Sequence, residues 1–358
     1  MNPLKENSKF IPHNKPTLSV EEEKITKKII RSGWLAQGKE VKNFEKDFCD
    51  FLELPEEHAV AVSSGTAALF LALWAMNAKG KNVAFPVYAC SSLRHAVAMV
   101  GGTEVLLDSS SNSPNVDTEK LKKAEFDLAI VPHMFGLPFD LSPFSNLRII
   151  EDCAQAIGAK ISGNHVGLTG EIGIFSFYAT KLMTSGGQGG MIVSKDKFLI
   201  DAIRDYREFD CRNDQKKRFN FQITDLQAAI GRIQLKKLPE FLKRRKEIFQ
   251  IYCKKLPMLE FEKSKYLGIS PVYYRAILRT NYPRKVIEAL ENENIKTIVP
   301  IEDWELMGKA SLFPNANQWT KNTVSLPIYP SLKDFQIDFI IEQITKLNHS
   351  HKLIKILK

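Results

Sequence analysis

The sequence predicts an α/β fold: a large domain with a mainly parallel β-sheet sandwiched by helices, followed by a smaller C-terminal α+β domain. Between about residue 55 and residue 195, short apolar runs of strand length alternate with helical patterns. These runs are apolar almost throughout, which is typical of parallel strands buried on both faces. A chain of 358 residues is also long enough for two domains.

Each expected element follows from a local pattern. An apolar helix should begin at Gly65, directly after a strand and a Ser-Ser turn. A firmer helix is expected over 223–238, because Thr224 and Gln227 have the spacing of a capping box before an apolar face. The expected strands are 58–64, 82–88, 103–109, 127–135, 147–153, 173–178 and 190–195.

The pattern changes after Pro239 to a long charged helix, a few short apolar runs and a terminal helix over 332–348. This change predicts a large domain with an N-terminal arm over 1–245 and a small C-terminal domain over 246–358.

Composition excludes several classes of protein. No apolar run reaches the roughly 18 residues of a membrane span, and the polar start lacks a signal-peptide core, so we expect a cytoplasmic protein with no membrane partner. The net charge of +9 is spread along the chain, which argues against nucleic acid as a partner. No disulfide or metal site is indicated, since the cysteines are scattered: Cys49, Cys90, Cys153, Cys211 and Cys253.

Three polar groups are expected at the carboxyl ends of the strands, where ligands of parallel sheets bind. The amine of Lys181 can form an imine with an aldehyde, and Asp152 can keep a heteroaromatic nitrogen protonated. The helix start at Gly65 and Thr66 offers free N–H groups to a phosphate. Each signal is weak alone, but together they match pyridoxal 5′-phosphate (PLP).

Two further side chains fit the same cofactor. The amide of Gln155 can donate a hydrogen bond to the ring phenolate oxygen, and the hydroxyl of Ser176 can donate one to the phosphate.

Five ordered motifs resemble those of the DegT/DnrJ-type sugar-nucleotide aminotransferases: "SSGTAALFLAL", "EDCAQAIGA", "FSFYATK" with "GGQGG", "FNFQITDLQAAIG" and "SLPIYPSL". The likeness runs from about Ile11 to about Ile341. It implies the fold-type I architecture of PLP enzymes, L-glutamate as the amino donor, and a homodimer with active sites between its subunits.

The resemblance also implies residue roles. Lys181 is similar to the imine lysine, Asp152 to the partner of the ring nitrogen, and Gln155 to the partner of the ring hydroxyl. Asn220 matches an asparagine that reaches the phosphate of the neighbouring subunit. The phosphate-binding positions are Gly65, Thr66 and Ser176.

Three positions depart from the family pattern. The family usually has an acidic residue at Gln188 and a basic one near Gln222. Where it often has an aromatic residue that stacks on the cofactor, this chain has Cys90, and Tyr88 is a candidate to replace that ring.

The chemistry predicts a PLP-dependent transaminase that moves the amino group of L-glutamate to a keto sugar, most readily a nucleotide-linked keto-deoxyhexose. The departures leave open a non-nucleotide phosphorylated keto compound as acceptor. A dehydratase is disfavoured, because related dehydratases replace the lysine by histidine and this chain has Lys181. A catalytically silent sensor or scaffold on the same fold is the alternative from another class.

Overall fold

A computed structural model describes residues 10–257 and 268–351. Its centre is a seven-stranded sheet in the order β1-β9-β8-β5-β4-β2-β3. The strands are β1 (Ala59–Val62), β2 (Asn82–Pro86), β3 (Thr103–Leu107), β4 (Leu128–Pro132), β5 (Ile149–Asp152), β8 (Ile172–Ser176) and β9 (Gly190–Val193). Within this sheet only β9 runs antiparallel to its neighbours. The predicted mainly parallel sheet is confirmed, and each of its strands overlaps a predicted run.

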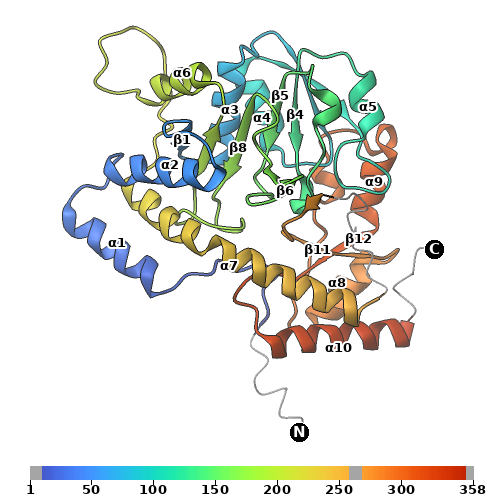
Figure 1. Cartoon of the computed structure of the whole chain (residues 1–358). Helices are drawn as coiled ribbons and strands as arrows, with labels where there is room; N and C mark the ends of the chain where they lie inside the picture. Colours follow the sequence, from blue (N-terminus) through green and yellow to red (C-terminus); the bar gives the residue numbers. More distant parts are fainter. Residues whose placement is uncertain (1–9, 258–267, 352–358) are drawn as a thin grey trace.

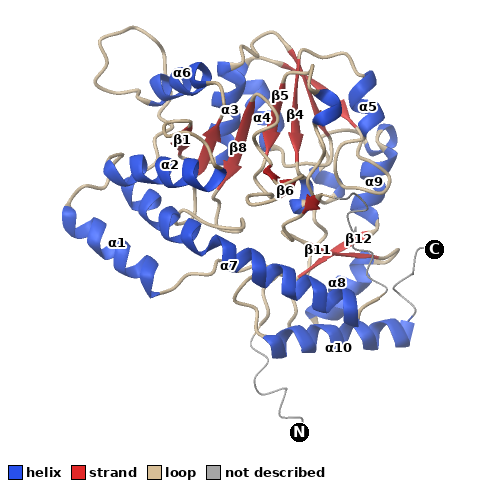
Figure 2. Ribbon diagram, viewed as in Figure 1, coloured by secondary structure: helices blue, strands red, loops and turns tan. Residues whose placement is uncertain are grey.

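Helices enclose this sheet on both faces (Figure 2). Alternate residues along β1 divide between the two sides: Val60 and Val62 pack in one apolar cluster, and Ala59 and Ala61 in another. The first cluster includes residues of α3 (Gly65–Ala75), α4 (Ser92–Val100) and α6 (Lys197–Arg207), and the second includes α2 (Lys39–Leu52) and α7 (Asp225–Lys255). Burial on both faces explains why the strands are apolar throughout.

Helix α7 links the sheet to the C-terminal part of the molecule. It begins with the predicted capping box, in which the side chains of Thr224 and Gln227 each bond the backbone of the other residue. It packs against α2 and α1 (Val20–Ser32), and its far end contacts α10 (Asp334–His351) (Figure 1). Because α7 continues through residue 245, its own ends do not mark a domain boundary, and the division there stays a prediction.

The C-terminal part has its own apolar cluster. It combines residues of the end of α7 with β11 (Ala276–Arg279), β12 (Thr323–Leu326), α8 (Pro283–Glu291) and α10, and Ile11 from the N-terminal segment joins it. The remaining α-helices and strands are α5 (Thr118–Lys123), α9 (Pro314–Lys321) and a small sheet of β6 (Lys160–Ile161), β7 (Asn164–His165) and β10 (Ile269–Ser270). Across the described ranges, no helix has the length and apolarity that a membrane crossing requires.

Candidate active site

A cavity lies at the carboxyl ends of the central strands. It is lined from the ends of β4, β5 and β8 and from the starts of α3 and α4. Seven of the eight residues expected at the cofactor line it: Gly65, Thr66, Cys90, Asp152, Gln155, Ser176 and Lys181. The structure therefore brings together residues that span more than a hundred positions of the sequence.

The start of α3 forms one wall of the cavity. Ser64 caps the helix, because its Oγ accepts a hydrogen bond from Ala67 N at 3.1 Å. The N–H groups of Gly65 and Thr66 lie in the first turn, where a helix offers them no internal partner. A Cβ on Gly65 would lie 2.8 Å from Cβ of Ser176 and 3.1 Å from its Oγ. The Ser176 hydroxyl thus lies directly beside the helix start, an arrangement that suits a phosphate.

Asp152 ends β5 and is largely buried. Its Oδ1 accepts a hydrogen bond from Ala154 N at 2.9 Å, and no described residue donates to its Oδ2. Burial raises the pKa of this carboxyl, against the opposing effects of the Ala154 N–H, Lys181 and the nearby His133. A buried carboxylate with one free oxygen fits a protonated ring nitrogen, which would supply the missing donor.

Gln155 presents its amide with a defined orientation. Its Oε1 accepts a hydrogen bond from Phe135 N at 2.8 Å. With the oxygen held there, the two N–H groups of Nε2 remain to donate to a ligand in the cavity. This orientation fits the predicted bond to an oxygen on the cofactor ring.

Lys181 follows β8, in a turn where its own N–H donates to Tyr178 O at 2.9 Å. Its Nζ lies 5.5 Å from the centroid of the Tyr274 ring, from the C-terminal part of the molecule. The glycine-rich loop that follows passes close to α3, since a Cβ on Gly190 would lie 2.4 Å from Ser64 O. The close approach explains the glycine there.

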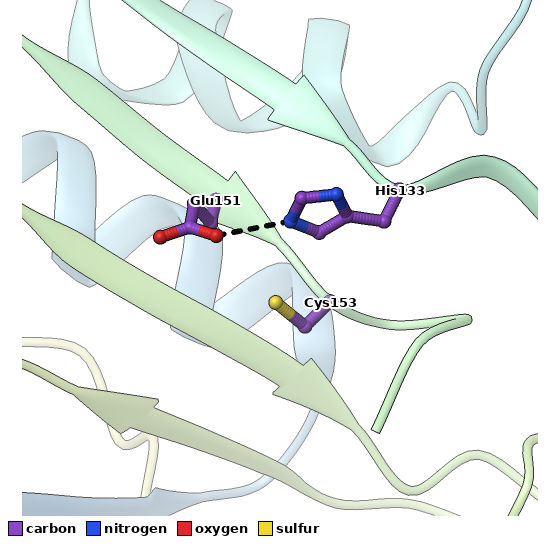
Figure 3. A group of neighbouring side chains, drawn as sticks. All are labelled: His133, Glu151 and Cys153. Atoms are coloured by element: carbon purple, nitrogen blue, oxygen red, sulfur yellow. Dashed lines mark hydrogen bonds and ion pairs between the residues drawn. The ribbon is translucent and has the colours of Figure 1, made fainter. Parts of the chain in front are cut away.

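His133 also lines the cavity, and its position was not predicted. Its Nδ1 accepts a hydrogen bond from Phe139 N at 3.0 Å, so Nε2 carries the hydrogen and donates to Glu151 Oε2 at 3.0 Å (Figure 3). His133 directly follows β4, just as Asp152 ends β5, so the strand-end rule that singled out Asp152 applies to it as well.

Glu151 is the acceptor in its hydrogen bond with His133. It accepts further hydrogen bonds from the N–H groups of Gly167, Thr169 and Gly170 at 2.6–2.7 Å. Burial alone would raise the pKa of this carboxyl, but the bonds from His133 and the backbone lower it below its ordinary value. The thiol of Cys153 lies near Glu151 and His133, and all three residue types can bind a metal ion. The hydrogen bonds described above, however, already occupy the Glu151 carboxylate and His133 Nε2. We therefore interpret the group as a buried hydrogen-bond network that holds His133 in place at the cavity.

The three departures from the family pattern fall at different places. Cys90 and Gln188 line the cavity, whereas Gln222 does not and faces Glu208 instead. Tyr88 is fully buried and packs its ring against Phe135 and Trp319. The idea that Tyr88 replaces the missing aromatic ring is therefore wrong, because its side chain belongs to the core and not to the cavity lining.

Asn220 does not line the cavity of its own chain. It is exposed on the segment between α6 and α7, which extends away from the sheet (Figure 1). Ion pairs of Arg218 with Asp205 and Asp214 hold this segment. The role of Asn220 in a neighbouring subunit stays a prediction.

Comparison with known proteins identifies the family. A model of the DegT/DnrJ/EryC1/StrS aminotransferase family matches residues 16–345. The chain belongs to this family. Its fold is therefore that of the fold-type I PLP enzymes, and it is an aminotransferase whose family uses PLP. The predictions of family, fold, activity and cofactor are confirmed.

Individual relatives of this aminotransferase are similar over nearly their full lengths. The spore coat polysaccharide biosynthesis protein SpsC of Bacillus subtilis is 31% identical, over 95% of this chain and 98% of that protein. GDP-perosamine synthase of Vibrio cholerae is 28% identical, over 92% and 96%. Among solved structures, the aminotransferase TlmJ of Streptoalloteichus hindustanus has a TM-score of 0.88 at 25% identity, covering 94% and 98% of the two chains. DesV of S. venezuelae has a TM-score of 0.83 at 27% identity, covering 91% and 94%.

Proposed function

We propose that this aminotransferase transfers the amino group of L-glutamate to the keto carbon of a sugar, with both half-reactions in the cavity described above. The observation that carries the proposal is the convergence of Lys181, Asp152 and the start of α3 on one cavity. An amine, a buried carboxylate and a phosphate seat are the three groups that PLP chemistry needs from a protein.

Lys181, Asp152 and Gln155 are each assigned one role toward the cofactor. When bound, PLP supplies an aldehyde that condenses with an amine and a ring that withdraws electrons from the neighbouring carbon. Lys181 would hold the cofactor through its amine, and its Nζ would move a proton at the donor α-carbon. Asp152 Oδ2 keeps the ring nitrogen protonated, and Gln155 Nε2 donates to the ring hydroxyl oxygen.

The phosphate is assigned to the N–H groups of Gly65 and Thr66 and to the hydroxyl of Ser176, which lies beside them. Cys90 lines the cavity, at the position where the family resemblance implies a ring that stacks on the cofactor.

The acceptor is proposed to be a nucleotide-linked 4- or 3-keto-6-deoxyhexose, used in the synthesis of amino sugars or surface polysaccharide. The names of the relatives support this, since they include a GDP-perosamine synthase and a spore coat polysaccharide protein. A net charge of +9 also suits an anionic nucleotide sugar.

The working form is proposed to be a cytoplasmic homodimer in which Asn220 of each chain reaches the phosphate held by the other. Large exposed apolar side chains near the N-terminus support a second copy as partner. They are Phe10, Leu18, Val20, Ile30, Trp34 and Leu35.

The test is a screen of keto-sugar nucleotides with L-glutamate, which measures release of 2-oxoglutarate. We expect release that depends on one class of keto sugar. Absence of release with every keto sugar, from a protein that contains PLP, would overturn the proposed acceptor.

A further inference from the structure

A group of cationic side chains with neutral partners lies beside Lys181. Arg275 immediately precedes β11, and its Cζ lies 5.2 Å from the centroid of the Tyr274 ring. Nζ of Lys181 lies 5.5 Å from the same centroid. Arg275 Cζ is also 6.0 Å from the Phe135 ring, whose residue bonds Gln155 through its N–H. Arg275 is therefore a close neighbour of the candidate active site.

The charge of Arg275 is not compensated by any described residue. Its one recorded hydrogen-bond partner is His13 Nε2, 3.3 Å from Nη1, and its Nε is buried with no acceptor in the described ranges. Two other buried or half-buried guanidinium groups have carboxylate partners: Arg207 pairs with Glu45, and Arg232 with Glu40 and Asp47. Arg275 thus keeps guanidinium donors without an acceptor among the described residues, and such donors can bind a carboxylate.

The neighbours of Arg275 add positive charge. Arg245 is fully buried, and its Nη1 donates to the carbonyls of Tyr273, Tyr274 and Ile328. Burial, followed by the charges of Arg275 and Arg245, holds the pKa of His13 well below its usual value. His13 is therefore neutral, and it accepts from Arg275 without balancing its charge.

The same positive charges affect the pKa of Tyr274. Burial would raise the pKa of its hydroxyl, but Lys181, Arg275 and Arg245 lower it below its ordinary value. Binding one anion to a half-buried guanidinium in such a field would remove an electrostatic cost.

We propose that Arg275 binds a carboxylate of the amino donor, with His13 orienting the guanidinium. This proposal rests on the proposed function and names the donor side of that site. Arg275 would be a binding residue for the α-carboxylate of the donor.

The position of Arg275 favours the donor over the anionic part of the acceptor. The N-terminal segment lies against the active-site turn, since Asn14 Nδ2 donates to Thr180 O at 2.6 Å. Lys15, Pro16 and Thr17 line a small second cavity together with Lys181 and Arg245. Because Lys181 Nζ and Arg275 Cζ lie 5.5 and 5.2 Å from the centroid of the same Tyr274 ring, an anion at Arg275 would lie near the reacting amine. The α-carboxylate of an amino acid is bonded to the reacting carbon, whereas the diphosphate of a nucleotide sugar lies several bonds from its keto carbon.

The test uses the holoenzyme with glutamate and no sugar, following the cofactor absorbance in single turnovers. We expect Arg275→Gln to raise the apparent dissociation constant of glutamate by about 10- to 100-fold, the range for a lost charge-assisted bond. The matched control is Arg284→Gln, which removes an exposed guanidinium of α8 that pairs with Glu302, and it should leave the constant unchanged. Arg275→Lys keeps the positive charge but lacks the paired N–H donors of a guanidinium, so it should give an intermediate dissociation constant.

Two further measurements locate the effect. Binding of glutarate, a dicarboxylate without the reacting amine, should weaken by a similar factor in Arg275→Gln when titrated calorimetrically. The acceptor half-reaction, started with enzyme first aminated by glutamate, should keep its dependence on keto sugar.

Unchanged glutamate and glutarate binding in Arg275→Gln would overturn the subsite, and so would a defect confined to the acceptor half-reaction. A wild-type holoenzyme that gives no single turnover with glutamate would instead overturn the proposed function. The glutarate titration would then still test whether Arg275 binds a carboxylate.

Discussion

Single residues carry the chemistry, and Asp152 shows how. Its free Oδ2 and its burial make it the acid suited to a protonated ring nitrogen. We expect Asp152→Asn to fold and to bind PLP but to lose turnover by at least about 100-fold, or about 2.7 kcal/mol of barrier, because a neutral amide cannot hold the ring proton. Steady-state kinetics and the absorbance spectrum test this. Near-normal turnover would assign the role to another acid.

Glu151 affects stability rather than chemistry. Its folded pKa is lowered, so its contribution is fully present above the unfolded value of about 4.3 and is lost as pH falls through the folded pKa. We expect Glu151→Gln to reduce the free energy of unfolding at pH 7 by about 2–3 kcal/mol and to weaken the loss of stability in acid. Urea unfolding at several pH values measures both.

The control for this change is Glu104→Gln. Glu104 pairs with Arg94 at the surface, so the variant should lose less than about 1 kcal/mol. Equal losses in the two variants would contradict a special role for the buried Glu151 network.

Sequence reasoning at the residue scale found the groups whose chemistry is distinctive. It placed Lys181, Asp152 and Gln155 at one site, and the structure brings them to one cavity. It overlooked His133, because a histidine after a strand has many ordinary roles. It left the role of Tyr88 open, since the direction of a side chain near a strand end depends on packing against distant residues such as Trp319.

At the scale of elements, the start of α3 depends on close contact with β8. A Cβ on Gly65 would lie 2.8 Å from Cβ of Ser176, so Gly65→Ala must displace the helix start or the strand. We expect this variant to remain folded and to release PLP at least about tenfold more readily, since one bond to a charged group is worth about 1.5–3 kcal/mol. Equilibrium dialysis of the cofactor measures the change.

A second substitution tests the cause. Ser176→Gly removes the Cβ that Gly65→Ala would meet, so the double variant should retain PLP better than the sum of the two single changes predicts. Strictly additive losses would show that the contact does not set the position of α3.

The elements themselves were predictable where the pattern is local. Apolar runs bounded by turns marked the strands of the main sheet, and the capping box of Thr224 and Gln227 marked the start of α7. The order of the strands and the antiparallel direction of β9 were not predictable, because pairing depends on contacts between residues far apart in sequence. The short strands β6, β7 and β10 are too brief to show a pattern.

At the scale of the whole molecule, the proposed dimer completes each site with Asn220. We expect Asn220→Ala to stay folded and to weaken PLP retention by about 10- to 100-fold, the effect of one lost bond to a charged group. Asn213→Ala, an exposed change on the same segment, should have no effect. Cofactor dissociation and sedimentation together test this, and a monomer that retains PLP fully would contradict the shared site.

The central claim is that Lys181 is the amine that holds the cofactor, and borohydride reduction tests it most directly. Reduction of the wild-type holoenzyme, followed by digestion and mass spectrometry, should find a pyridoxyl group on the peptide that contains Lys181. Lys181→Ala should take up PLP without being fixed by borohydride and should lose transaminase turnover. A pyridoxyl group on any other lysine, or full turnover in the Ala variant, would contradict the account.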